Sequence, residues 1–192
     1  CRIHSEDDFE YRVLRLSQIR EGADYPGIRV FLTAIYDRVK TPFSVDVTTG
    51  DAITPKEIEY RFPLVFDAGY VHILSYNLET ILAEKLQTIL SRGITNTRMR
   101  DFYDIYVLNS VYCDEIDYVV LKQAILKTSE RRKKNNVLIE SEEIMKKICS
   151  DDTLRGLWNN YRIEFFYARQ IEFDMACTAV GALLKKLSQK EL

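Results

Sequence analysis

The sequence predicts an α+β protein in which a small, mainly antiparallel sheet comes first and a bundle of helices follows. All four prolines lie before residue 64, and five of the seven glycines lie before residue 94. Turn-forming residues are therefore concentrated in the first half of the chain. Strands that precede helices, rather than alternate with them, indicate an α+β fold. We expect a sheet portion at 1–75 and a helical domain at 76–192.

Alternation of apolar and polar residues predicts the strands. The turn at 22–27, with Tyr25-Pro26-Gly27 at its tip, separates the first two strands, and Thr49-Gly50-Asp51 ends the third. Two shorter extended pieces follow around Pro63 and Gly69. The predicted strands cover residues 9–16, 28–36, 43–48, 60–66 and 70–74.

Helical periodicity predicts the remaining elements. Asn96 or Thr97 is expected to cap the second helix, Ser141 a later one, and Asp151 or Asp152 the helix after that. The final helix begins with acidic residues and ends with lysines, an order that complements the helix dipole. The predicted helices cover two segments within 77–108, then 115–134, 141–148, a segment after 152, and 172–190.

Composition excludes several classes of protein. The chain has 192 residues, a net charge of −2 and a pI of about 5.8, so no overall positive field indicates nucleic-acid binding. Four widely spaced cysteines argue against a zinc site or a disulfide scaffold and fit a reducing cytoplasm. No apolar run reaches the roughly 18 residues of a membrane span. Neither a dinucleotide-binding glycine motif nor a P-loop occurs.

Lys85 is the most informative residue of the helical part. On a helical wheel it falls on an apolar face beside Leu82 and Ile89, and a buried lysine needs a partner. The next helix carries Asp101 among apolar residues, with Arg98 three positions before it and Asp104 three positions after it. Two readings are open: a structural ion pair between two helices, or the wall of an active site that retains charges for a phosphate or a metal.

Four segments resemble one known family, the AbiEii/AbiGii nucleotidyltransferase-like toxins of bacterial abortive-infection and toxin–antitoxin systems. The similarity covers about residues 9–110, and the segments are specific for the family when they occur together. The segments are YPGIRVFLTA at 25–34, FSVDVTTGDAITP at 43–55, LAEKL at 82–86 and TRMRDFYDIYVL at 97–108.

This resemblance implies the back part of a polymerase-β-like nucleotidyltransferase fold, and a reaction that moves a nucleotide from a nucleoside triphosphate to an acceptor such as RNA. It implies Mg²⁺ as cofactor with Asp46 as a metal ligand, and Lys85, Asp101 and Asp104 as catalytic residues. Lys85 and Arg98 would also bind the nucleotide phosphates. A cognate antitoxin is a further implied partner, and phage defence the implied setting. The sequence does not assign separate roles to the two aspartates.

One departure from the family pattern concerns the N-terminal motif. The family begins with a Gly-Ser turn and an Asp-x-Asp strand, whereas no Gly-Ser dipeptide occurs here and the first residue is Cys1. We therefore expect this chain to be a fragment or a truncated form without the front half of the catalytic site. The intact protein would be an enzyme if it carried that motif. The alternative is a non-catalytic module that binds a nucleotide, RNA or an antitoxin.

Overall fold

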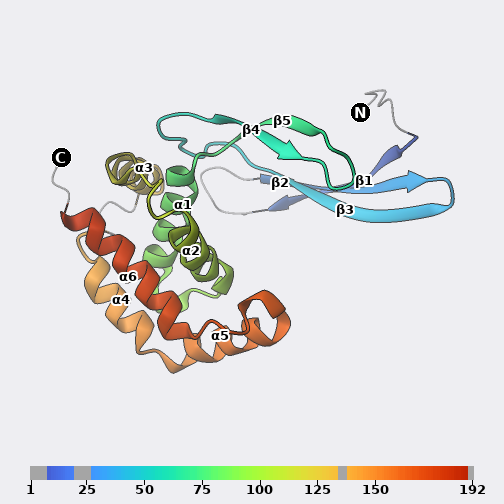
Figure 1. Cartoon of the computed structure of the whole chain (residues 1–192). Helices are drawn as coiled ribbons and strands as arrows, with labels where there is room; N and C mark the ends of the chain where they lie inside the picture. Colours follow the sequence, from blue (N-terminus) through green and yellow to red (C-terminus); the bar gives the residue numbers. More distant parts are fainter. Residues whose placement is uncertain (1–7, 20–26, 134–137, 190–192) are drawn as a thin grey trace. The chain divides into compact units, whose positions relative to one another are not determined.

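The computed structural model describes residues 8–19, 27–133 and 138–189. The predicted turn at 22–27 lies largely outside these residues. The chain divides into two compact units, residues 1–51 and 52–192. The boundary predicted between residues 75 and 76 does not separate these units; it lies within the second unit, between the last strand and the first helix. Figure 1 gives the order of the elements, and the α+β class expected from the sequence is confirmed, with small antiparallel sheets preceding six α-helices among the described residues.

The first unit contains a three-stranded antiparallel sheet of strands β1 (Glu10–Ile19), β2 (Gly27–Tyr36) and β3 (Val39–Val47). The strands are paired in chain order, with a register shift between Val13 and Arg15. A tight turn joins β2 to β3, and Asp37 adopts a positive φ of 49° there, a conformation that aspartate tolerates better than most residues. All three strands are longer than alternation predicted, because backbone pairing continues past the apolar segments.

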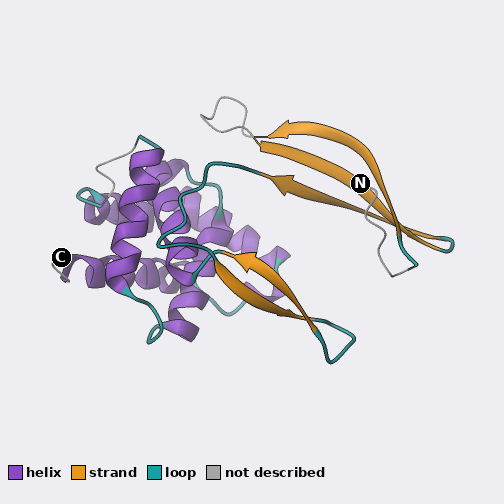
Figure 2. Ribbon diagram, turned by 90° about the horizontal axis from the view of Figure 1, so that it is seen from above, coloured by secondary structure: helices purple, strands orange, loops and turns teal. Residues whose placement is uncertain are grey.

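The second unit begins with the hairpin of β4 (Ile58–Pro63) and β5 (Tyr70–Ser75) and continues into the helices, which Figure 2 shows in purple. The helices are α1 (Leu78–Arg92), α2 (Met99–Tyr112), α3 (Tyr118–Arg131), α4 (Ser141–Cys149), α5 (Asp152–Glu164) and α6 (Phe173–Gln189), with short 3-10 turns η1 (Gly93–Thr95) and η2 (Phe166–Ala168).

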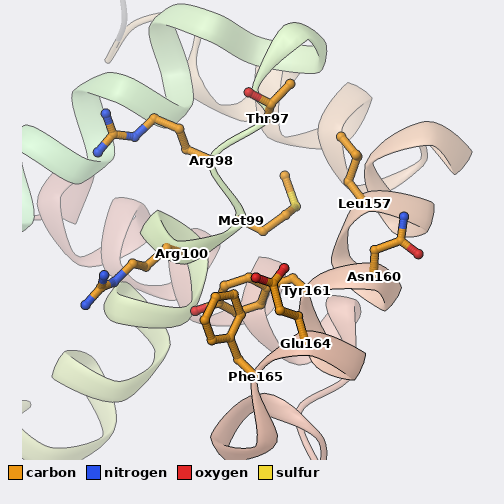
Figure 3. Close-up of a pocket in the computed structure, with 9 residues that line it drawn as sticks. All are labelled: Thr97, Arg98, Met99, Arg100, Leu157, Asn160, Tyr161, Glu164 and Phe165. Carbon is orange, nitrogen blue, oxygen red and sulfur yellow. The ribbon is translucent and has the colours of Figure 1, made fainter. Parts of the chain in front are cut away.

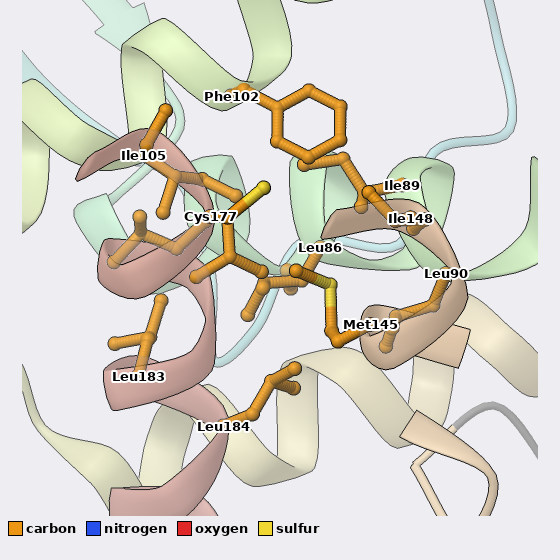
Figure 4. Packing of buried hydrophobic residues seen from close by; sticks show 14 of the residues in the cluster. Leu86, Ile89, Leu90, Phe102, Ile105, Met145, Ile148, Cys177, Leu183 and Leu184 are labelled. Atoms are coloured by element: carbon orange, nitrogen blue, oxygen red, sulfur yellow. The ribbon is translucent and has the colours of Figure 1, made fainter. Parts of the chain in front are cut away.

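One apolar core joins these helices (Figure 4). Leu86 and Ile89 of α1 meet Phe102 of α2, and α4 and α6 close the core from their own apolar faces. Trp158 of α5 is fully buried and donates its indole N–H to the carbonyl of Ile171 at 2.9 Å. Burying aromatic and aliphatic side chains of this size contributes about 1.5–3 kcal/mol each, so the core can hold charged side chains at its edge.

A buried hydrogen-bond network fixes the start of α1. Asn77 accepts the backbone N–H of Thr80 at 2.8 Å and donates its side-chain amide to the carbonyl of Thr54 at 2.7 Å. Thr80 in turn accepts the backbone N–H of Thr54 at 3.0 Å. The segment before β4 is therefore attached to the first turn of the helix that carries Lys85.

Two predicted caps need correction. Ser141 is the first residue of α4 rather than its N-cap, because its hydroxyl donates to the carbonyl of Leu138 at 2.7 Å and does not accept from the helix. Arg98 occupies the N-cap position of α2, and Asn96 accepts the N–H of Arg98 rather than one inside the helix. Asp151 caps α5 as predicted, accepting the N–H of Leu154.

Candidate functional site

Two consecutive helices carry the candidate site. Helix α1 ends at Arg92, and its C-cap Gly93 has a φ of 54°, which glycine readily adopts; the η1 turn then leads into α2. Because this connection is short, α1 and α2 lie side by side. Lys85 in the middle of α1 therefore faces the first two turns of α2, where Asp101 and Asp104 lie.

Lys85 bridges the two aspartates. Its ammonium nitrogen lies 2.5 Å from Oδ2 of Asp104 and 3.5 Å from Oδ1 of Asp101. The side chain of Asp101 is 4% exposed, whereas those of Lys85 and Asp104 are 20% and 23% exposed. One carboxylate is thus buried against the helices, while the other and the ammonium remain accessible to solvent.

Two arginines add positive charge around this bridge. Arg98 Nε lies 2.9 Å from Oδ2 of Asp101, and Arg100 Nε lies 3.9 Å from Oδ2 of Asp104. The contact between Arg98 Nε and Asp101 Oδ2 does not have the geometry of a hydrogen bond. Among the described residues, this buried oxygen therefore has no hydrogen-bond partner. We call Lys85, Arg98, Arg100, Asp101 and Asp104 the charged cluster; it holds more cations than anions.

A groove of about 330 Å³ adjoins the charged cluster (Figure 3). The start of α2 forms one wall and the second half of α5 the other, and Met99 points between them. The guanidinium groups of Arg98 and Arg100 extend away from the α5 wall. The residues that line the groove are Thr97, Arg98, Met99, Arg100, Leu157, Asn160, Tyr161, Glu164 and Phe165.

The tyrosines beside the cluster have shifted acidity. Burial raises the pKa of Tyr103, and the neighbouring Tyr167 and the negative charge of Asp104 raise it further. Burial likewise raises the pKa of Tyr161 well above its ordinary value of 10.0, with contributions from its hydrogen bond to Tyr167 and from Asp104. Both phenols therefore stay protonated at neutral pH and can donate hydrogen bonds.

Asp46 lies in the other compact unit, on β3 of the three-stranded sheet. It is paired with Arg29 of β2 in the strand register, and the Arg29 guanidinium donates to both of its carboxylate oxygens, at 2.6 and 2.8 Å. Both side chains are 43% exposed. The structure thus brings Lys85, Arg98, Asp101 and Asp104 together, whereas the role of Asp46 stays a prediction.

Comparison with protein families identifies the chain. The profile described as "Nucleotidyl transferase AbiEii toxin, Type IV TA system" matches residues 1–179. This chain belongs to the AbiEii toxin family. The family expected from the sequence is therefore confirmed, and the match extends well beyond the similar segments at 25–108, into α6.

Other comparisons add little to this assignment. A crystal structure from H. pylori described as that of a candidate nucleotidyltransferase is similar at 14% sequence identity, with a TM-score of 0.43. The similarity covers 95% of this AbiEii chain and 70% of the other. No curated protein matches the chain. Within the described ranges, no helix is both long and apolar enough to cross a membrane.

Arg100 and Tyr161 belong to the surroundings of the AbiEii candidate site but were not singled out from the sequence as site residues. Arg100 could have been found, because it lies four positions before Asp104 on one helix and such pairs interact. Tyr161 could not, because it reaches the site from α5, and only tertiary packing brings that helix to α2.

Proposed function

We propose that this AbiEii-family chain takes part in transferring a nucleotide from a nucleoside triphosphate to an acceptor such as RNA. The observation that carries the proposal is the Lys85 bridge, an accessible ammonium held between two carboxylates and flanked by two arginines. A purely structural ion pair does not need an excess of positive charge at a surface, whereas a polyphosphate site does.

The charged cluster provides binding and proton transfer. Arg98 and Arg100, with side chains 56% and 77% exposed, can bind phosphate oxygens through two-pronged contacts, and Lys85 stabilises the charge that develops during transfer. The acceptor oxygen forms a bond to the α-phosphorus, the bond to the β-phosphate oxygen breaks, and pyrophosphate leaves. The acceptor hydroxyl gives its proton to one of the two carboxylates.

Exposure distinguishes the two carboxylates within this proposal. Asp104 is the more accessible and can reach an incoming hydroxyl, whereas Asp101 is buried and fixes the position of Lys85 and Arg98. Asp101→Asn and Asp104→Asn separate these roles. Asp104→Asn, which lacks the proton acceptor, loses turnover with little change in nucleotide affinity. Asp101→Asn, which lacks the positioning residue, loses nucleotide affinity as well.

Magnesium is part of the proposal. Mg²⁺ binds one or two carboxylates together with phosphate oxygens and water, so the Asp46 carboxylate is a ligand of the right chemistry once it has released Arg29. When bound, the ion would neutralise phosphate charge. Among the described residues no group of three His, Cys, Asp or Glu side chains is placed to hold a metal. Titrating Mg²⁺ in the presence of nucleotide tests this role, because Asp46→Asn should weaken the dependence on the ion, and an unchanged dependence would remove Asp46 from the site.

The family also supports a biological setting for this activity. Within the proposal, the chain acts in the cytoplasm as the toxin of a type IV toxin–antitoxin system, with a cognate antitoxin as partner and phage defence as its role. Expression of the intact protein with and without its neighbouring antitoxin gene measures toxicity and its suppression.

Transfer of radiolabel from an α-labelled nucleoside triphosphate to RNA tests the reaction directly. Lys85→Met should abolish transfer in the intact protein, while Lys127→Met, which removes an exposed lysine of α3, should leave it unchanged. Transfer by the Lys85→Met variant at the wild-type rate would refute the proposal.

A second candidate function is a module that binds nucleotide, RNA or antitoxin without catalysis. The observation that favours it is the engagement of both Asp46 oxygens by Arg29. Saturable nucleotide binding that is lost in Lys85→Met, without transfer under any metal condition, would establish this alternative.

A further inference from the structure

An aromatic cluster lies next to the charged cluster and projects into solvent. We call Tyr103, Tyr161, Phe165, Phe166 and Tyr167 the aromatic corner; it joins α2 to the end of α5 and to η2. Phe166 is 78% exposed and Tyr167 is 40% exposed. Large aromatic rings at such exposure lose much of the free energy that burial would give them, which calls for a reason other than packing.

Contacts behind the exposed rings hold them in place. The ring centroids of Tyr167 and Phe165 are 5.5 Å apart and nearly parallel, at 29°, and Tyr167 lies 4.8 Å from Tyr103. The hydroxyls of Tyr161 and Tyr167 are hydrogen-bonded at 3.2 Å. Figure 3 shows Phe165 beside Tyr161 at the lower end of the groove. The corner is therefore a preorganised surface rather than a flexible loop tip.

Arginines fix and surround this surface. Arg162 donates to the carbonyl of Arg169 from two nitrogens, at 3.1 and 2.5 Å, and so closes the turn that carries the rings. The Nη1 atom of Arg162 forms an ion pair with Oε2 of Glu172 at 2.6 Å. Tyr103 contacts Tyr167 and lies on the same helix, α2, as Arg100, Asp101 and Asp104. Asp104 and Arg100 are also near enough to Tyr161 to affect its pKa. The aromatic corner therefore adjoins the charged cluster.

We propose that the aromatic corner binds single-stranded RNA by stacking an unpaired base on Phe166 and Tyr167, which leads the strand to the charged cluster. This inference rests on the proposed function, because it locates the acceptor of that reaction. A single-stranded nucleic acid is recognised by aromatic rings interleaved with basic side chains. An enclosed pocket would suit a mononucleotide better, whereas Phe166 lies on an open, exposed surface.

The test measures binding of a fluorescent oligouridine of about 12 nucleotides, a length within the span of such surfaces, by fluorescence anisotropy. The full chain is compared with Phe166→Ala, Phe166→Trp and two matched controls. Stacking is worth about 1–3 kcal/mol per base, so Phe166→Ala should weaken binding about fivefold or more, and Phe166→Trp should restore it. Ile163→Ala removes a similarly exposed apolar side chain and Phe66→Ala a more exposed one, both in the same unit, and both variants should leave binding unchanged.

An abasic oligomer of the same length and charge separates stacking from charge. It should bind the wild-type chain more weakly than oligouridine does, and Phe166→Ala should reduce this difference. Equal affinity of the wild type for the two oligomers would overturn the proposal, as would unchanged oligouridine binding in Phe166→Ala or an equal loss in both controls.

Further measurements distinguish this inference from its competitors. If Phe166→Ala weakened binding of a nucleoside triphosphate but not of RNA, the corner would be a mononucleotide site, and if it weakened only antitoxin binding, it would be a protein interface; either result overturns the inference. Lys85→Met should lose transfer, whereas its binding of oligouridine should still depend on Phe166. RNA binding through Phe166 without any transfer would refute the proposed function and leave the stacking site in place.

Discussion

Replacing Lys85 with methionine separates the stabilising from the functional role of the Lys85 bridge. Methionine keeps the volume and the apolar stem of lysine but removes the ammonium that lies 2.5 Å from Asp104 and 3.5 Å from Asp101. Asp101, at 4% side-chain exposure, is left among helices and keeps Arg98 as a cationic neighbour at 2.9 Å.

Burial and the remaining partners set the expected loss of stability. Exposed ion pairs contribute about 0.2–1 kcal/mol, and removing one member of a fully buried pair costs about 3–5 kcal/mol. Lys85 is 20% exposed, and each aspartate keeps an arginine, so the loss should lie between these limits, at about 2 kcal/mol. For a chain of this size that corresponds to a fall in Tm of about 4–8 °C.

Denaturant and thermal unfolding measure this loss, with Lys127→Met as the control for removal of an exposed lysine. A domain stable by about 5–15 kcal/mol stays folded at 25 °C after such a loss, so absence of transfer in the same sample would reflect chemistry and not unfolding. A loss below about 0.5 kcal/mol would refute the argument from burial. A loss above about 4 kcal/mol with transfer retained would identify a structural pair and refute the catalytic role.

Three further predictions follow from other parts of the chain. Because the pKa of Tyr161 is raised in the folded state, its contribution to stability is complete below pH 10 and is lost as the pH rises through the folded-state value. Unfolding free energy should therefore fall above pH 10, and Tyr161→Phe should make that fall shallower in chemical denaturation. The hydrogen bond between the two thiols lowers the pKa of Cys149 and raises that of Cys177, so iodoacetamide at about pH 8 should modify Cys149 first; equal modification in mass spectrometry would contradict this. A Cβ on Gly27 would lie 2.9 Å from both Ile19 and Thr48, so Gly27→Ala should destabilise the first unit by about 1–3 kcal/mol, seen as faster limited proteolysis of that unit alone.

Local patterns predicted four of the five members of the charged cluster, all but Arg100, because their spacing is helical. Lys85 was expected on an apolar face and next to Asp101, and the structure brings it to both Asp101 and Asp104. A periodic spacing of 3.6 residues and a short connection leave few ways to arrange two neighbouring helices. The closer contact with Asp104 could not be predicted, because it depends on how far one helix is shifted along the other.

Long-range arrangements were harder to predict. The bidentate salt bridge between Arg29 and Asp46 depends on the register of β2 and β3, which the alternation of apolar and polar residues does not determine. Tyr161 and Phe166 belong to a segment interpreted only as part of a packing bundle, and their relation to the site arises from the tertiary contact of α5 with α2. The wrong assignment of Ser141 as a cap shows that capping preferences do not identify the acceptor that a hydroxyl actually meets.

The hydrogen bonds that join Thr54 to the start of α1 also bear on amide exchange. The backbone N–H of Thr54 is bonded to the Thr80 hydroxyl, and the N–H of Thr80 to Asn77, with Thr54 and Thr80 almost wholly inaccessible. Deuterium can reach either amide only when the segment before β4 and the first turn of α1 open together. These two protons should therefore exchange at one common rate, which would report the opening of the helix that holds Lys85.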